Sequence, residues 1–250
     1  MEKTEKKENR FGLLGRSISY SFSQGYFTEK FKTLGLTDHS YENFDILDIS
    51  EFTAILKQDN LKGFNVTIPY KEEVIPFLNN LDATAKEIGA VNTIKITKNG
   101  LVGYNTDAYG FQKSLEPFLK PDHSKALILG TGGASKAVKF VLQTLGISPI
   151  YVSRTKKSGQ LTYQELDKTI MESHTLIVNC TPLGTYPNVE EKPSIPYHLL
   201  SNRHLLFDLI YNPRKTAFLK AGEAKNSTIC NGLDMLRFQA EKAWEIWNSI

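Results

Sequence analysis

The stretch that decides the fold is Ala126-Leu127-Ile128-Leu129-Gly130-Thr131-Gly132-Gly133-Ala134-Ser135. Its first four residues are apolar and predict a buried strand, and the glycines that follow predict a tight turn opening a helix over 134–145. Glycine lets the backbone approach a pyrophosphate, and a helix N-terminus offers unpaired N–H groups. A dinucleotide site is therefore predicted at Gly130, Thr131, Gly132, Gly133 and Ala134, with a purely structural turn as the alternative.

The residues that follow the next predicted strand, 150–153, indicate which type of cofactor binds. Ser153-Arg154-Thr155 stands there, about 20 residues beyond the glycine turn, where an acidic residue would bind a ribose hydroxyl and an arginine a 2′-phosphate. A fixed cation predicts NADP rather than NAD. The alternative is a solvated basic loop, which Lys156 and Lys157 extend.

Strand and helix patterns alternate on both sides of this unit. Toward the C-terminus, strands are predicted at 175–180 and 205–210, which favours a parallel sheet with right-handed crossovers, and a long helix is predicted over 233–250. Toward the N-terminus, the pattern predicts strands at 11–15, 41–47 and 63–68, helices at 25–36, 51–58, 71–81 and 108–119, and a hairpin over 92–104 that turns at Asn99-Gly100. The fold class is thus α/β, with two α/β domains.

Composition excludes several classes of protein. The chain has 250 residues, 40% of them hydrophobic, and its net charge of +3 is too small for a surface that binds nucleic acid. Residues 1–10 contain no apolar run, which predicts neither a secretory signal nor a membrane anchor. Cys180 and Cys230 match no disulfide or metal-ligand spacing, so we expect no metal and a reducing, cytoplasmic compartment.

Six segments, taken in order, resemble the shikimate dehydrogenase family. Besides the glycine turn they are Ser21-Phe22-Ser23, Asn65-Val66-Thr67-Ile68-Pro69-Tyr70-Lys71, Gly89-Ala90-Val91-Asn92-Thr93, Gly103-Tyr104-Asn105-Thr106-Asp107 and Asn231-Gly232-Leu233-Asp234-Met235-Leu236, which leads to Gln239. The resemblance implies reversible reduction of 3-dehydroshikimate to shikimate by NADPH, in aromatic amino acid biosynthesis. It also implies a substrate domain of residues 1–107 plus 233–250, a dinucleotide domain of residues 108–232, and a Rossmann-like fold for the latter. The expected partner is a small-molecule substrate, with no nucleic acid or membrane, and the expected state is a monomer or homodimer.

The resemblance also assigns roles to residues. Lys71 and Asp107 are implied as the catalytic pair. A lysine beside a carboxylate can protonate the alkoxide that hydride addition leaves, whereas the alternative is an ordinary surface ion pair. The ring hydroxyls are implied to bind Thr67, Lys71, Asn92, Asp107 and Gln239, with Tyr211 as a phenolic donor, and Leu209 and Gly232 are implied to flank the nicotinamide.

Two further predictions rest on local sequence. Ser21 and Ser23, in an extended segment, would point the same way and donate to one substrate carboxylate, although serines in loops are more often turn residues. Thr181 follows a predicted strand at the cofactor face and is expected to touch the nucleotide. Neighbouring Cys180 is expected to be a small buried residue rather than a nucleophile, and the five histidines are expected to be structural or exposed.

Two other functions stay open at this stage. The family's usual His-Ser-x-Ser-Pro appears here as Tyr20-Ser21-Phe22-Ser23-Gln24, which leaves a quinate/shikimate dehydrogenase with relaxed specificity as one alternative. The other is a non-catalytic dinucleotide-binding sensor. Presence of Lys71 and Asp107 favours the enzyme.

Overall fold

The computed structural model describes residues 8–19 and 21–249. Tyr20, residues 1–7 and Ile250, which the predictions above include, lie outside the described residues. The chain divides into two compact units, residues 1–106 with 240–250 and residues 107–239. Both divisions fall within helices, α4 (Thr106–Leu115) and α8 (Leu233–Asn248).

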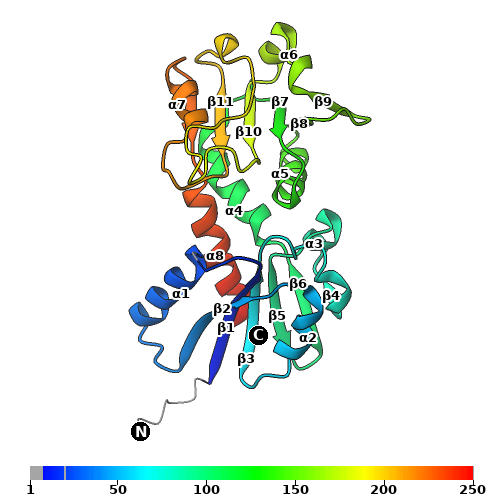
Figure 1. The fold of residues 1–250 in the computed structure, drawn as a ribbon, viewed down its shortest axis with the longest axis vertical. Coiled ribbons are helices and arrows are strands. Elements are labelled where there is room, and N and C mark those ends of the chain that lie inside the picture. Colours follow the sequence, from blue (N-terminus) through cyan, green and yellow to red (C-terminus); the bar gives the residue numbers. More distant parts are fainter. Residues whose placement is uncertain (1–7, 20, 250) are drawn as a thin grey trace. The chain divides into compact units, whose positions relative to one another are not determined.

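The second unit contains the sheet that the glycine-rich stretch predicts (Figure 1). In the described part of the chain its six strands are ordered β12-β11-β10-β7-β8-β9, and every pairing is parallel. If the strands of this unit are numbered from β7 as the first, they follow the doubly wound order 3-2-1-4-5-6. The sequence of strands turns back between β7 and β10, the first and fourth strands, although all strands run parallel. Its strands are β7 (Lys125–Leu129), β8 (Ser148–Ser153), β9 (Gln160–Thr162), β10 (Leu176–Asn179), β11 (Leu205–Asp208) and β12 (Thr228–Cys230), and its helices include α5 (Gly133–Thr144), α6 (Lys168–Ser173) and α7 (Ala217–Glu223).

Both faces of this sheet are buried, as a parallel sheet requires. On one face Leu206 of β11 packs in a cluster with Met171 of α6 and Phe218 of α7. On the other, the ring of Phe207 meets Phe111 of α4 edge-on, with centroids 5.0 Å apart. Consecutive apolar residues of one strand therefore serve two layers of helices, which explains the absence of polar alternation in the sequence.

The first unit has a mixed sheet ordered β2-β1-β3-β5-β6-β4 in the described residues. β1 lies parallel to β2 and β3, whereas β3, β5 and β6 pair antiparallel. This confirms the predicted hairpin, but its two turn residues are Lys98 and Asn99 rather than Asn99-Gly100, because Gly100 already pairs with Thr97. The elements are β1 (Asn9–Gly15), β2 (His39–Asp45), β3 (Leu61–Val66), β4 (Asn80–Leu81), β5 (Thr93–Thr97) and β6 (Gly100–Tyr104), with helices α1 (Phe22–Thr33), α2 (Phe52–Ile55) and α3 (Ala83–Ile88).

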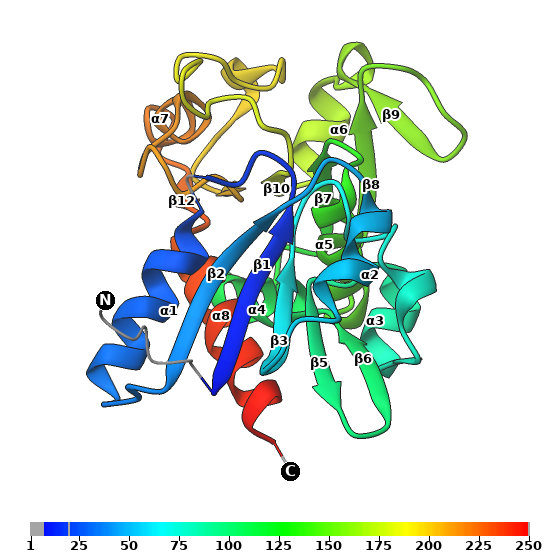
Figure 2. The ribbon, with the colours of Figure 1, turned by 60° about the horizontal axis from the view of Figure 1, so that its bottom comes forward.

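Helices lie on both faces of the first unit's sheet (Figure 2). An apolar cluster lies between the sheet and the helices on each face. Phe27 of α1 stacks on Tyr41 of β2 at 4.7 Å and also contacts Trp247 of α8. The Trp247 indole donates to the Ile94 carbonyl at 3.0 Å, which fixes the end of α8 to the sheet. On the opposite face, Phe52 of α2 packs edge-on against Phe64.

The predicted helix over 71–81 is wrong. Turns occupy residues 68–74, and a single 3₁₀ turn, Ile75–Phe77, is followed by β4. Pro76 lies in that turn, where its missing N–H costs nothing, whereas inside an α-helix it would remove a hydrogen bond and clash with the preceding turn. The prediction also missed α3, α6, α7, β9 and β12, which are short.

Helix lengths and polarities bear on membrane crossing. Within residues 8–19 and 21–249, the helices are all too short or too polar to span a bilayer.

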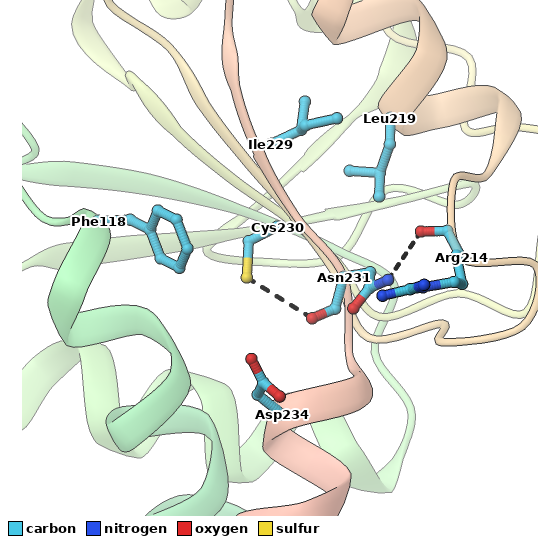
Figure 3. A pocket seen from close by; sticks show the side chains of 7 residues that line it. All are labelled: Phe118, Arg214, Leu219, Ile229, Cys230, Asn231 and Asp234. Carbon is cyan, nitrogen blue, oxygen red and sulfur yellow. Dashed lines mark hydrogen bonds between the residues drawn. The ribbon is translucent and has the colours of Figure 1, made fainter.

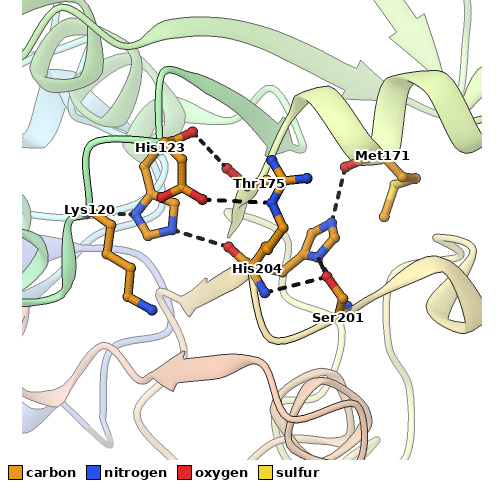
Figure 4. Close-up of polar contacts among 8 residues, drawn as sticks. Lys120, His123, Met171, Thr175, Ser201 and His204 are labelled. Carbon is orange, nitrogen blue, oxygen red and sulfur yellow. Dashed lines mark hydrogen bonds and ion pairs between the residues drawn. The ribbon is translucent and has the colours of Figure 1, made fainter.

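Two buried histidines hold loops at the amino ends of the second sheet's strands (Figure 4). His123 accepts from the Lys120 N–H at 3.0 Å, and its other ring nitrogen lies 3.3 Å from the Arg203 carbonyl. His204 accepts from the Ser201 N–H at 3.1 Å and meets the Met171 carbonyl at 3.0 Å. Each ring is thus an acceptor at Nδ1 and a donor at Nε2, which is the neutral imidazole. This confirms the structural role predicted for these two histidines.

We expect the unfolding free energy to fall as pH is lowered from about 7 to 5.5. Burial lowers the pKa of His123 and His204 in the folded chain, so below the unfolded value the unfolded state binds more protons. Each histidine then contributes a slope of up to about 1.4 kcal/mol per pH unit. Urea unfolding of the parent and of His123→Gln/His204→Gln should show a steeper acid loss in the parent, and exposed His198→Gln should match the parent. Equal slopes in all three proteins would contradict this role.

Candidate active site

Three of the sequence motifs meet in the first unit through hydrogen bonds to backbone carbonyls, two from backbone N–H groups and one from the Asn105 side chain. The Val91 N–H donates to the Lys71 carbonyl at 2.7 Å, and the Asn92 N–H donates to the Tyr104 carbonyl at 3.0 Å. The Asn105 amide donates to the Ala90 carbonyl at 2.9 Å. Segments that contain Lys71, Asn92 and Asn105-Thr106 are therefore adjacent, although up to 35 positions separate them in sequence.

Asn92 fixes the start of helix α4. Its Oδ1 accepts from the Thr106 N–H at 2.6 Å, and its Nδ2 donates to the Thr106 hydroxyl at 3.0 Å. Asp107 is the next residue and is buried in the first turn of α4, which begins two residues before the predicted start of that helix at 108. A carboxylate is favoured there because the helix dipole presents its positive end.

The prediction that Ser21 and Ser23 share one extended segment is wrong, because α1 begins between them. Ser21 has extended backbone angles and is the N-cap of α1, whereas Ser23 lies inside the first turn. α1 begins this early because Phe27 and Phe31 bury its inner face. Ser23 is buried and hydrogen-bonds the Tyr41 phenol. The buried Ser21 hydroxyl has no hydrogen-bond partner among the described residues.

Sequence reasoning missed a chain of buried polar side chains behind these serines. The pKa of Tyr41 is raised by burial, so the phenol stays protonated and donates to Asn65 Oδ1 at 2.8 Å. Asn65 in turn donates to the Thr93 hydroxyl at 3.2 Å, and Thr93 hydrogen-bonds Asn92 Oδ1 at the same distance. Asn65 inside an apolar strand was the one signal that pointed to this network.

The remaining predicted substrate residues lie in separate elements. Thr67 directly follows β3, and its N–H donates to the Leu14 carbonyl at 2.9 Å. Gln239 is buried on α8, and a Cβ placed on Gly110 of α4 would lie 3.1 Å from the Gln239 Cβ. Asp107 precedes Gly110 by one turn, so Gln239 packs beside the helix that carries Asp107. Tyr211 is half-buried, and burial raises its pKa.

The glycine turn has the form that a dinucleotide requires. Gly130 has φ +97°, which disfavours any side chain, and Gly132 is the N-cap of α5. A Cβ on Gly132 or Gly133 would meet nothing within 4 Å, and no side chain caps α5. Ser135 replaces the usual third glycine by turning its buried hydroxyl onto the Gly132 carbonyl at 2.7 Å.

Arg154 stands at the end of β8, beyond the glycine turn. The Ser153 hydroxyl donates to the Thr155 carbonyl at 2.5 Å and closes the loop around Arg154. Lys156 is engaged by Glu165 at 2.5 Å. Arg154 itself is exposed, and the described residues give it no ion pair or hydrogen bond. An exposed guanidinium of this kind can donate to phosphate oxygens.

Thr181, Leu209 and Gly232 lie close to other predicted cofactor residues. A Cβ on Gly130 would lie 2.9 Å from the Thr181 methyl group, so Thr181 packs against the glycine turn. A Cβ on Gly232 would clash with the Leu209 carbonyl, so only glycine fits beside Leu209. Strand ends and loops thus bring these positions together.

A pocket of about 260 Å³ in the second unit lies beside the Asn231-Gly232 motif (Figure 3). It contains none of the predicted site residues; its lining includes Phe118, Arg214, Cys230 and Asp234. Burial raises the pKa of Cys230 to about 12 and raises that of Cys180 as well. Both thiols are free and protonated at neutral pH, which argues against a nucleophilic role.

Comparisons with known proteins agree on one family. Residues 13–94 match the model of the shikimate dehydrogenase substrate binding domain. A shikimate dehydrogenase (NADP(+)) from Clostridium beijerinckii is 38% identical over 252 residues, which cover 95% of this chain and 91% of the relative. The crystal structure of shikimate dehydrogenase 1 from Peptoclostridium difficile has a TM-score of 0.82 at 40% identity and covers 96% of this chain and 91% of that chain. A shikimate 5-dehydrogenase from Thermus thermophilus, in complex with NADP(H) and shikimate, has a TM-score of 0.82 at 30% identity, covering 97% and 94%.

Proposed function

The chain belongs to the shikimate dehydrogenase family, and we propose that it carries out the reversible reduction of 3-dehydroshikimate to shikimate with Lys71 and Asp107 as its catalytic pair. The fold class, family and NADP cofactor expected from the sequence are confirmed. The observation that carries the proposal is a pair of hydrogen bonds: the Val91 N–H donates to the Lys71 carbonyl, and the side chain of Asn92, the next residue, accepts from the N–H of Thr106, which precedes Asp107.

The chemistry assigned to this chain is proton transfer and orientation. When bound, NADPH would supply the hydride for reduction of the carbonyl carbon. The Lys71 ammonium then donates a proton to the carbonyl oxygen, and in the reverse direction the neutral amine takes the hydroxyl proton. Asp107 accepts a hydrogen bond from a ring hydroxyl and so orients the substrate. Asn92, Thr67, Gln239 and Tyr211 bind the other oxygens.

The residues of the second unit fit NADP. Open space at Gly132 and Gly133 and the uncapped start of α5 suit the pyrophosphate, and Arg154 suits the 2′-phosphate. Residues Thr131, Ala134, Ser153 and Thr155 complete the adenosine side of the proposed site. Thr181, Leu209 and Gly232 form the proposed nicotinamide side.

A direct assay tests the function. Purified protein should oxidise NADPH in the presence of 3-dehydroshikimate and reduce NADP when given shikimate. Quinate with NAD, run in parallel, tests the relaxed-specificity alternative. NADPH binding without turnover of 3-dehydroshikimate would favour the non-catalytic sensor instead.

We expect Ser21→Ala to raise the KM for 3-dehydroshikimate more than it lowers kcat. Ser21 has a buried hydroxyl without a partner among residues 8–19 and 21–249, which suits a donor to the substrate carboxylate. Hydrogen bonds to charged groups are worth about 1.5–3 kcal/mol, or roughly ten- to a hundred-fold in KM. The contact exists in ground and transition states alike, so kcat should change little. Exposed Thr28→Ala on the same helix is the control, and a normal KM in Ser21→Ala would place the carboxylate elsewhere.

The two units are proposed as the two domains of the enzyme. The match of residues 13–94 to a substrate-binding domain supports that role for the first unit, and the doubly wound sheet supports cofactor binding by the second. Free thiols at Cys180 and Cys230 support a cytoplasmic location. The proposed partners are the small-molecule substrate and cofactor, without nucleic acid or membrane, in a monomer or homodimer.

A further inference from the structure

Asn179 and Asp208 form a buried polar pair that no sequence motif assigned. They are the last residues of β10 and β11 and face each other across the parallel register. Both are 0% exposed, and Asn179 Nδ2 donates to Asp208 Oδ1 at 3.0 Å. Two strand ends are thus tied together by side chains.

Each member of the pair also holds a backbone segment. Asn179 Oδ1 accepts from the Thr181 N–H at 3.0 Å and from the Thr181 hydroxyl at 2.7 Å. Asp208 accepts from the Ile210 N–H at 3.1 Å and from the Thr216 hydroxyl at 2.6 Å. The orientation of Thr181 and the path of residues 208–210 therefore depend on one connected set of bonds.

These segments carry the proposed nicotinamide contacts. Thr181 packs against Gly130, and the Leu209 N–H donates to the Asn179 carbonyl at 3.0 Å. The Gly232 N–H donates to the Ile210 carbonyl at 3.1 Å, with Gly232 against Leu209. A buried carboxylate costs desolvation energy, and an apolar pair of similar volume is often as stable, so stability alone gives little reason for this one.

We propose that Asn179 and Asp208 are positioning residues for hydride transfer, because together they set the places of Thr181, Leu209 and Gly232. The inference rests on the proposed function, since it takes those three residues as cofactor contacts. Neither side chain is among the groups proposed to touch the reacting atoms. Their effect passes through the backbone that they hold.

An exchange of the two side chains tests the pair. Asn179→Asp alone places two carboxylates face to face, whereas Asn179→Asp/Asp208→Asn restores a donor opposite an acceptor. In the single variant Asp208 loses the amide donor of Asn179 and faces a second buried carboxylate, so like-charge repulsion disturbs both strand ends. We expect kcat to fall about tenfold or more in Asn179→Asp, within the range of coupling between contacting residues. The double variant should recover most of this loss, but not all, because the Ile210 N–H loses its acceptor.

The measurements are kcat, both KM values, the dissociation constant of NADPH from fluorescence titration, and the melting temperature. Asp208→Asn, the second single variant, completes a double-mutant cycle with Asn179→Asp and the double variant. Asp167→Ala removes a helix cap in the same unit, where Asp167 accepts from the Ile170 N–H at 2.8 Å, and costs about 1 kcal/mol without touching the pair. It should lower the melting temperature and leave kcat unchanged.

Recovery of kcat and of NADPH affinity in the double variant supports the pair. If the loss of kcat in the double variant equals the product of the losses in the two single variants, the proposal is overturned. It is also overturned if kcat falls in proportion to the melting temperature in all variants, including Asp167→Ala. A parent protein that binds NADPH but reduces no 3-dehydroshikimate contradicts the proposed function instead. In that case the dissociation constant of NADPH still tests the pair. Recovery of NADPH affinity in the double variant supports the pair, and no recovery contradicts it.

Discussion

Lys71→Ala should lower kcat for reduction of 3-dehydroshikimate by about 10²–10⁴-fold, the usual effect of losing a positioned acid–base group. Lys71 follows β3 in a turn, and its carbonyl accepts from the Val91 N–H at 2.7 Å, a backbone bond that alanine at this position can also make. The KM for 3-dehydroshikimate should change far less. Steady-state kinetics at several pH values measure both quantities.

Two further variants make the result specific to Lys71. Lys71→Arg keeps the positive charge but cannot release a proton near neutral pH, so its kcat should stay low while substrate binding is largely retained. Lys62→Ala removes an exposed lysine from the neighbouring strand β3 and should behave like the parent. A Lys71→Ala protein with near-normal kcat would remove Lys71 from the mechanism.

Arg154→Ala should raise the KM for NADP(H) by roughly ten- to a hundred-fold and leave that for NAD(H) nearly unchanged. The 2′-phosphate is the only chemical difference between the two cofactors, so discrimination must come from groups near that ribose. Arg154 is exposed on a loop that Ser153 and Thr155 close, and its planar guanidinium can fork onto phosphate oxygens. Added salt should weaken NADP(H) binding more in the parent than in the variant.

The neighbouring basic residues provide a matched comparison for Arg154. Exposed Lys157→Ala removes a cation from the same loop and tests whether general positive charge suffices. A small effect there beside a large one in Arg154→Ala indicates specific recognition. Equal losses for NADP(H) and NAD(H) in Arg154→Ala would mean that the arginine supports the loop, and a parent that prefers NAD would overturn the cofactor assignment for this chain.

Local sequence was sufficient for most of the architecture. An apolar run followed by glycines places β7, the turn and α5 because hydrophobic periodicity and backbone freedom act over a few neighbouring residues. The same holds for the hairpin of β5 and β6, where a two-residue turn sets the register. Strands of three residues, such as β9 and β12, carry too little pattern to be detected and form only against an existing sheet edge.

The order of motifs along the chain also determined the family. The site residues that the family resemblance assigns stay predictions. What it did not determine was how those side chains are oriented. Ser21 and Ser23 share a motif, yet burial of Phe27 and Phe31 starts α1 between them and sends one hydroxyl to Tyr41 while the other has no partner among the described residues. Pro76 likewise prevents the α-helix that the pattern of residues 71–81 predicted, and it lies in a 3₁₀ turn instead.

Only the tertiary structure reveals the pairing of Asn179 with Asp208 and the chain of polar groups from Ser23 to Asn92. Asn179 and Asp208 are 29 positions apart, and they meet because β10 and β11 are neighbours in register. Sequence patterns report the interactions of a residue with its neighbours along the chain and with water. Partners contributed by another strand are chosen by the packing of the whole unit, where each buried donor must find an acceptor.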